Sequence, residues 1–136
     1  MADAREMLEE QVRRQARIDE VGAALTVDAE VSLARLDRHA ARQVQRLAPF
    51  GVGFPEPLFL SRGVTLKRRS IVGENKHARF CLQNGTASID GVAFNADPEF
   101  FQLPRGSRLD VVFHLQLDKW NGREKPEIRL RDWRLH

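Results

Sequence analysis

The 136-residue chain has little of what covalently braced or membrane-anchored folds require. It contains one cysteine, and one thiol cannot close an internal disulfide or supply cysteine-rich metal spacing. No apolar run approaches the roughly 18 residues that span a bilayer. Residues 1–10 are acidic and lack the basic start and apolar stretch of a secretory signal. These absences exclude a disulfide scaffold and a membrane span, and they favour a cytoplasmic protein.

Clusters of catalytic or metal-ligating side chains are also missing. The four histidines are scattered, and none lies three or four residues from another. No Gly-rich phosphate loop or Ser-His-Asp arrangement can be argued from the spacing, and Cys81 is best explained as an inert thiol without a nearby histidine. We therefore expect no catalytic residue, no metal ligand and no cofactor in this chain. An intact small hydrolase is the least favoured interpretation.

Charge is distributed unevenly along the chain. Residues 1–57 hold eight Lys and Arg against ten Asp and Glu, a net charge of −2, whereas residues 58–136 hold fourteen against nine, a net charge of +5. The two parts together give the net charge of +3. The basic second part can attract a polyanion; a well-solvated surface is the alternative.

The first part of the chain has helical periodicity. Residues 1–24 are rich in Ala, Glu, Arg and Gln and predict a helix with a thin apolar stripe, which needs a packing partner. An extended segment follows at 25–31, and Ser32 is the expected N-cap of a second helix. Apolar residues recur there at three- and four-residue spacing, and Pro49 ends the helix: Leu33, Leu36, Ala40, Val44 and Leu47.

After a Gly- and Pro-rich joint at 50–57, the period changes to two. Strands are expected at 62–72, 76–83, 87–95 and 109–118, with a helical turn at 97–101 and a last strand after the hairpin pair Asn121-Gly122. This order predicts a mainly β fold with N-terminal α-helices. It corresponds to a two-helix segment at 1–49, the joint, and a five-stranded oligonucleotide-binding (OB) barrel at 58–136. A small SH3-like barrel or an open antiparallel sheet is the competing topology.

An OB barrel binds a strand across one face, between the loop joining strands 1 and 2 and the loop joining strands 4 and 5. Both loops are basic here, and single-strand binding requires cations along the phosphates and flat rings under the bases. The predicted DNA-binding residues are Lys67, Arg68, Arg69, Lys76, His77 and Arg79 at the first loop, Lys119, Trp120, Arg123 and Lys125 at the second, and Arg129 and Arg131 on the last strand.

Two aromatic residues have alternative roles. Trp120 either stacks on a base or folds back over the open end of the barrel. Trp133 falls at period two with Arg129 and Arg131, which predicts a common stacking face. In the alternative, Trp133 caps the core and the arginines pair with acidic residues across the hairpin: Asp118, Glu124 or Glu127.

Two motifs carry a family resemblance. Residues 50–59 read Phe-Gly-Val-Gly-Phe-Pro-Glu-Pro-Leu-Phe, and Trp120-Asn121-Gly122-Arg123 precedes residues 128–132, Ile-Arg-Leu-Arg-Asp. In their order, these features resemble the C-terminal part of the RecJ single-stranded-DNA exonuclease family, comprising the end of its DHHA1 region and its OB domain. Phe54 departs from the asparagine usual in that family. The family's Asp-His-His and Gly-Gly-Gly-His segments are missing, and Asp37-Arg38-His39 is only a superficial echo.

The resemblance implies a module that holds single-stranded DNA while a 5′ to 3′ exonuclease acts elsewhere in DNA repair and recombination. Manganese or magnesium is expected only in a full-length family member. We expect this chain to be non-catalytic, a fragment whose partners are single-stranded DNA and either the missing nuclease core or other repair proteins. The alternative is a protein-interaction or interdomain brace module, which the thin apolar stripe of residues 1–24 favours.

Overall fold

The computed structural model describes residues 27–50, 55–74, 76–120 and 122–136, without the side chain of Trp120. The N-terminal elements are β1 (Ala29–Glu30), the 3-10 helix η1 (Leu33–Arg35) and α2 (Arg38–Gln45). The strands β2 (Phe59–Val72), β3 (His77–Asn84) and β4 (Ala87–Ala93) follow, and then α3 (Pro98–Gln102), β5 (Arg108–Trp120) and β6 (Arg123–Leu135). None of the helices in these residues has the length and apolarity that a bilayer crossing requires. The predicted helix at 1–24 lies outside the described residues.

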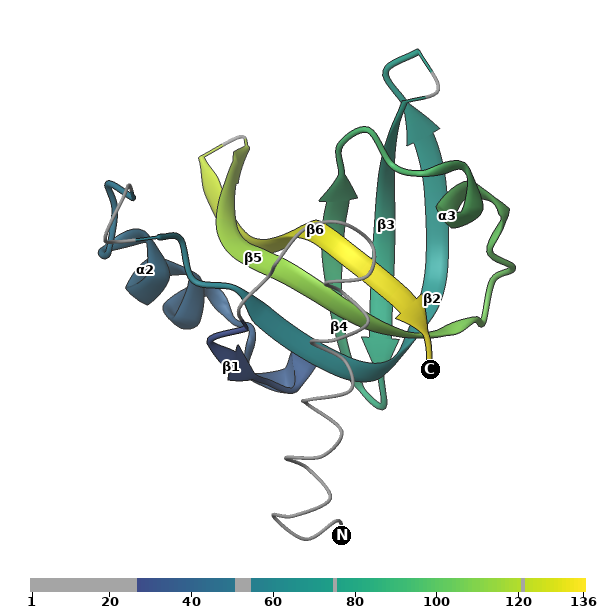
Figure 1. Ribbon diagram of the computed structural model, residues 1–136. Helices are drawn as coiled ribbons and strands as arrows, with labels where there is room; N and C mark the ends of the chain where they lie inside the picture. The colour runs from purple at the N-terminus through teal and green to yellow at the C-terminus, as the bar shows by residue number, and fades with distance from the viewer. Residues whose placement is uncertain (1–26, 51–54, 75, 121) are drawn as a thin grey trace, which may run out of the picture.

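Strands β2 to β6 form a closed barrel (Figure 1). They run in the order β2-β3-β4-β6-β5, and β5 returns to pair with β2. The β4–β6 pairing is parallel, and the other pairings within the barrel are antiparallel. The prediction of a mainly β, five-stranded OB-like barrel is confirmed.

The long strand β2 closes the barrel because it pairs with two neighbours. Its first half is registered with β5 and its second half with β3. The register with β5 shifts between Ser61 and Val64, where Gly63 takes a φ of +66°, and the register with β3 shifts between Leu66 and Arg68. Such bulges bend and twist a strand, so β2 can turn from one side of the barrel to the other.

The apolar residues that the period-two pattern of β5 turns inward form the barrel interior, but Asp110 and Val112 of the opposite face are buried as well. Leu109, Val111, Phe113 and Leu115 are buried. Helix α3 closes one end of this interior, because its Phe100 ring lies 5.5 Å from Phe80, centroid to centroid. The same ring lies 5.9 Å from Trp133, edge to face. Burial of these inward residues is the main contribution to folding.

Trp133 packs on the core, as the alternative interpretation of this residue expected. The prediction that it shares a stacking face with Arg129 and Arg131 is wrong. The β5–β6 register shifts between Val112 and Phe113: Phe113 opposes Leu130, but Val112 opposes Asp132. Arg131 is therefore an extra residue, and Trp133 opposes the buried Val111. Its indole Nε1 donates to Asp97 Oδ2 at 3.1 Å, and Asp97 Oδ1 also caps α3 by accepting from Phe100 N at 2.8 Å.

The second helix begins later than predicted. Ser32 precedes only the 3-10 turn and makes no side-chain cap bond, and Leu36 leaves the helical backbone. Asp37 is the N-cap of α2 instead, because its Oδ1 accepts from Ala40 N at 2.8 Å. Four apolar residues of this segment belong to the same buried cluster as the barrel interior: Leu33, Leu36, Ala41 and Val44. Leu47 lies beyond the helix and is exposed.

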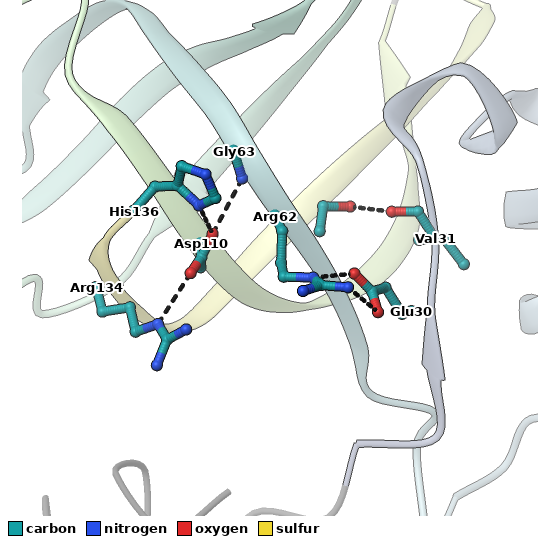
Figure 2. A network of polar contacts seen from close by, with 8 residues as sticks. Glu30, Val31, Arg62, Gly63, Asp110, Arg134 and His136 are labelled. Atoms are coloured by element: carbon teal, nitrogen blue, oxygen red, sulfur yellow. Dashed lines mark hydrogen bonds and ion pairs between the residues drawn. The ribbon is translucent and has the colours of Figure 1, made fainter. Parts of the chain in front are cut away.

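A polar network ties β1, β2, β5 and β6 together (Figure 2). Asp110 on β5 is 3% exposed, and it accepts from Gly63 N at 3.0 Å and from Arg134 Nε at 2.9 Å. His136 Nδ1 lies 2.8 Å from the same carboxylate. Beside it, Arg62 pairs with Glu30, and Ser61 Oγ donates to Val31 O at 2.7 Å. Burial raises the pKa of Asp110, but the hydrogen bonds outweigh it and the pKa is lowered overall.

The Asp110 network predicts a specific loss of stability in acid. A carboxyl whose pKa is lowered in the folded state stabilises the fold above its unfolded pKa of about 3.9 and loses that contribution as the pH falls through the folded pKa. We expect Asp110→Asn to lower the free energy of unfolding by about 3 kcal/mol at pH 7. The gap to the parent should narrow below about pH 4. Urea denaturation between pH 7 and pH 2.5 measures both.

Glu74→Gln is the matched control, because Glu74 is an exposed carboxylate in the β2–β3 turn. It removes the same charge and should change stability little. A gap between Asp110→Asn and the parent that stays constant from pH 7 to pH 2.5 would show that the Asp110 charge contributes nothing.

Candidate nucleic-acid interface

The outer face of the barrel carries two adjoining hollows, which we call the groove. The first hollow, of about 310 Å³, is formed by β2, β3, β4, β5 and β6. The second, of about 300 Å³, shares Arg68, Asp90 and Lys125 with the first and extends to Lys67, Cys81 and Ser88. The first hollow is lined by Arg68, Arg69, Ser70, Arg79, Phe80, Asp90, Gly91, Asp118, Lys125 and Glu127. The groove therefore crosses the sheet between the two loops that the sequence singled out.

Strand register explains why polar residues gather on this face. Ser70 opposes Arg79, Arg68 opposes Cys81, and Asp90 opposes both Cys81 and Glu127. Directly opposed residues lie on one face of a sheet. Their neighbours Phe80 and Ile128 point inward, and Gly91 lies between them without a Cβ because an added one would come within 2.6 Å of either side chain.

Asp90 joins the two hollows by binding two cations. Arg68 Nη2 lies 3.3 Å from Asp90 Oδ1, and Lys125 Nζ donates to Asp90 Oδ2. Partial burial raises the pKa of Asp90, but Lys125 and Arg68 lower it overall, so the carboxylate stays charged near neutral pH. The positive charges of Arg68 and Lys125 are therefore partly offset inside the groove.

Cys81 forms part of the second hollow but is 4% exposed. Burial and the nearby Asp90 carboxylate raise the pKa of its thiol. A thiol that stays protonated is a poor nucleophile, so the geometry gives Cys81 no reactive role.

Arg79 is the predicted cation best placed for a ligand. It is exposed, lines the first hollow and has no hydrogen bond or ion pair with another described residue. Lys67 is also exposed, at the bulge of β2, and lines the second hollow. Arg123 is exposed near the tip of the β5–β6 hairpin, with its Cα opposite that of Trp120. The side chain of Trp120 lies outside the described residues, so its predicted stacking stays a prediction.

Two of the other predicted residues, Arg69 and His77, have structural partners, and three more lie outside the groove lining. Arg69 Nη1 donates to Phe100 O at 2.6 Å and to Leu103 O at 2.8 Å, at the C-terminal end of α3. His77 Nδ1 accepts from Asn95 N at 3.0 Å. Lys119 opposes Glu124, which accepts from Arg42 of α2. Arg131 lines a separate hollow of about 130 Å³ beside Trp133. Lys76 is exposed in the first loop.

Arg129 is held by a pair of polar side chains. Its Nη1 donates to Gln116 Oε1 at 3.1 Å, and its Nη2 donates to Glu56 at the end of the joint. Pro57 of the same segment accepts a hydrogen bond from His114 Nδ1 at 2.8 Å. Arg129 therefore attaches the chain before β2 to the barrel. The earlier part of the joint, residues 51–54 with Phe54, lies outside the described residues.

Sequence patterns missed an exposed ring beside the first loop. Phe94 follows β4 directly and is 58% exposed, and its ring meets the His77 ring edge-on at 5.5 Å. The only signal was the apolar run Val92-Ala93-Phe94, which departs from strict alternation at the strand end. Phe94 lies outside the groove lining, in the separate hollow beside Trp133, and Val92 two residues before it opposes the groove residue Arg79. A large exposed ring is the residue type on which nucleobases stack.

A metal site requires several ligating side chains that converge on one point. Within them, no group of three or more His, Cys, Asp or Glu side chains is positioned to hold a metal ion. Two of the groove carboxylates have partners instead: Asp90 accepts from Lys125, and Glu127 accepts from Gln116.

The chain is similar to known proteins in sequence and in fold. The RecJ OB domain family matches residues 27–132. The chain is 30% identical over 91 residues to the single-stranded-DNA-specific exonuclease RecJ of Bacillus subtilis, covering 66% of this chain and 12% of that protein. It is 29% identical over 111 residues to RecJ of Salmonella typhimurium, covering 79% and 19%. The chain thus spans less than a fifth of the length of these relatives.

Solved structures also resemble this fold. RecJ of Thermus thermophilus in complex with Mn2+ superposes with a TM-score of 0.54 at 30% identity, over 71% of this chain and 14% of that one. An aspartyl-tRNA synthetase from Leishmania major superposes with a TM-score of 0.56 at 14% identity, over 90% of this chain and 26% of that one. The second likeness supports the fold alone.

Proposed function

Because this chain belongs to the RecJ OB-domain family, we propose that its barrel binds single-stranded DNA in the groove as a strand-holding module of a RecJ-like exonuclease. The observation that carries this proposal is the position of Arg79, an exposed guanidinium without a partner among the described residues, in a groove that crosses the barrel face. The family relationship supplies the single-stranded ligand.

The groove and the residues beside it offer the two interactions that a single strand requires. Lys67, Arg79 and Arg123 are exposed cations for the phosphates. Phe94 offers a ring to a base. In a duplex the bases are paired and stacked, so a ring cannot reach a base face without an unstacking cost. This geometry favours single strands over duplex.

In this proposal, the chemistry of hydrolysis takes place elsewhere. Metal-dependent phosphodiester cleavage needs carboxylates and imidazoles gathered around one or two cations, and the matched family here is the OB domain. The chain would act by positioning the strand.

A second candidate function is docking of a repair protein on the barrel. It is favoured by two exposed apolar residues at the end of β2, Ile71 and Val72, which are 51% and 38% exposed. Large exposed apolar side chains are typical of protein-binding surfaces.

The chain should bind a single-stranded oligonucleotide more tightly than duplex of the same length. Because phosphate contacts release counterions, its affinity should fall steeply as salt rises. Fluorescence anisotropy with a labelled oligonucleotide, at several salt concentrations, measures both effects. Equal affinity for duplex, or no binding at low salt, would contradict the proposal and bring the protein-docking function forward.

The groove is tested separately by a matched pair of arginines. Arg79→Ala should reduce the slope of log affinity against log salt by about 0.7 to 1. Arg38→Ala removes the same charge from the exposed surface of α2, outside the groove lining, and should leave the slope nearly unchanged. Equal effects of the two variants would show that net charge, and not the groove, attracts DNA.

Phe94→Ala should weaken single-strand binding by about 1 to 3 kcal/mol, because one base would lose its stacking partner. Its thermal stability should change little, because an exposed ring contributes little to the core. Leu135→Ala is the control, since Leu135 is 61% exposed and outside the groove lining. Fluorescence anisotropy measures the affinity of both variants, and thermal denaturation measures their melting temperatures. A Phe94→Ala variant with a lowered melting temperature and unchanged affinity would show that the ring has a structural role.

A further inference from the structure

One wall of the groove is acidic, although the proposed ligand is a polyanion. Asp118 on β5 and Glu127 on β6 line the first hollow on one side of β4, and Arg79 on β3 and Ser70 on β2 line it on the other side. We propose that these two carboxylates recognise a guanine base of the bound strand, which makes Glu127 and Asp118 specificity-determining residues. This inference rests on the proposed single-strand binding.

Glu127 is a buried carboxylate held in a fixed position. It is 7% exposed, and its Oε1 accepts from Gln116 Nε2 at 2.7 Å. Gln116 is fixed in turn because its Oε1 accepts from Arg129 Nη1 at 3.1 Å. No hydrogen bond from a described residue reaches Glu127 Oε2. Glu127 also lines the first hollow. A largely buried carboxylate gains from every hydrogen bond that it accepts, and a ligand N–H in the hollow would supply a donor to Oε2.

Asp118 is a second carboxylate without a described partner. It opposes Lys125 across the β5–β6 hairpin, but Lys125 donates to Asp90 instead. Gln116 opposes Glu127 in the same ladder, so Asp118 and Glu127 are diagonal neighbours on one face. The two acceptors therefore lie on the same side of the hollow.

This arrangement excludes a phosphate from the acidic wall and accepts hydrogen-bond donors. A carboxylate repels phosphate oxygens but accepts N–H groups. The Watson–Crick edge of guanine carries two adjacent N–H donors, at N1 and N2, whereas the single N3–H of thymine lies between two carbonyl oxygens that a carboxylate repels. The acidic wall therefore favours guanine and disfavours thymine.

The opposite wall complements the remaining edge of guanine. Guanine presents two acceptors, O6 and N7, which arginine contacts in a bidentate manner. Arg79 lines the same hollow from β3 and has no partner among the described residues. A hollow of about 310 Å³ is at the small end of ligand sites, which suits one base. The carboxylates can therefore accept from N1 and N2 of guanine while Arg79 donates to O6 and N7.

The test compares oligothymidines of equal length that carry a central guanine, inosine or thymine, by fluorescence anisotropy at one salt concentration. The parent chain should bind the guanine strand about fivefold more tightly than the all-thymine strand. Inosine lacks the N2 amino group, so its strand should bind with intermediate affinity. Glu127→Gln presents an amide donor to the base and should abolish or reverse the preference.

The control is Glu124→Gln, which removes the same charge from the other side of the hairpin, where Glu124 accepts from Arg42. It should keep the fivefold preference. Asp118→Asn provides a second variant in case Glu127→Gln does not fold, and it should reduce the preference. Base recognition would be overturned if the parent bound the three strands equally. It would also be overturned if Asp118→Asn and a folded Glu127→Gln both kept the preference for guanine. No binding to any strand would instead contradict the proposed function itself.

Discussion

Closure of the barrel through β2 is the constraint on which the rest of the structure depends. One strand must pair with β5 along its first half and with β3 along its second, and this requires both register shifts and the positive φ at Gly63. Closure leaves no free edge within the five-stranded barrel. It also fixes which side chains point outward, so the groove inherits its residues from the strand register. The Asp110 network strengthens this closure, because it joins β2 to the ends of β5 and β6 (Figure 2).

The outer face shows that a basic sequence does not by itself make a basic surface. Several of the cations that the sequence offers are bound within the fold: Arg69 to the carbonyls that end α3, Arg129 to Glu56 and Gln116, and Lys125 to Asp90. Within the groove, the exposed cations Arg79 and Lys67 have no side-chain partner among the described residues, and strand register places them. A groove with one guanidinium wall and one carboxylate wall can orient a base as well as attract a phosphate, because its polar groups point in known directions. The β5–β6 hairpin carries the acidic wall and projects beside α2 (Figure 1).

The fold could be predicted from the sequence because the period changes from helical to two after the joint, the apolar residues of β5 alternate clearly, and the core residues are apolar. Prediction failed where the register shifts. The bulge near Arg131 turns Trp133 toward Phe100, and a strict period of two cannot foresee an extra residue. It also failed for Ser32, because a short 3-10 turn intervenes before Asp37. Within the candidate site, Arg79 and Lys67 could be predicted because both flank the loop that joins the first two strands of the barrel. The partners of Arg69 and His77 and the exposure of Phe94 depend on contacts between residues 17 to 34 positions apart, which local patterns do not encode.

The central claim, that one face of the barrel binds single-stranded DNA, is tested most directly by mapping the contact surface. A titration of the isotope-labelled chain with a short single strand, followed by amide NMR shifts, would locate the bound residues without any substitution. The account predicts that the largest shifts fall on β3, β4 and β6 around Arg79, Asp90 and Lys125 and near Phe94, while α2 and β1 stay unchanged. Shifts concentrated on α2 and β1, with the groove amides unmoved, would contradict it.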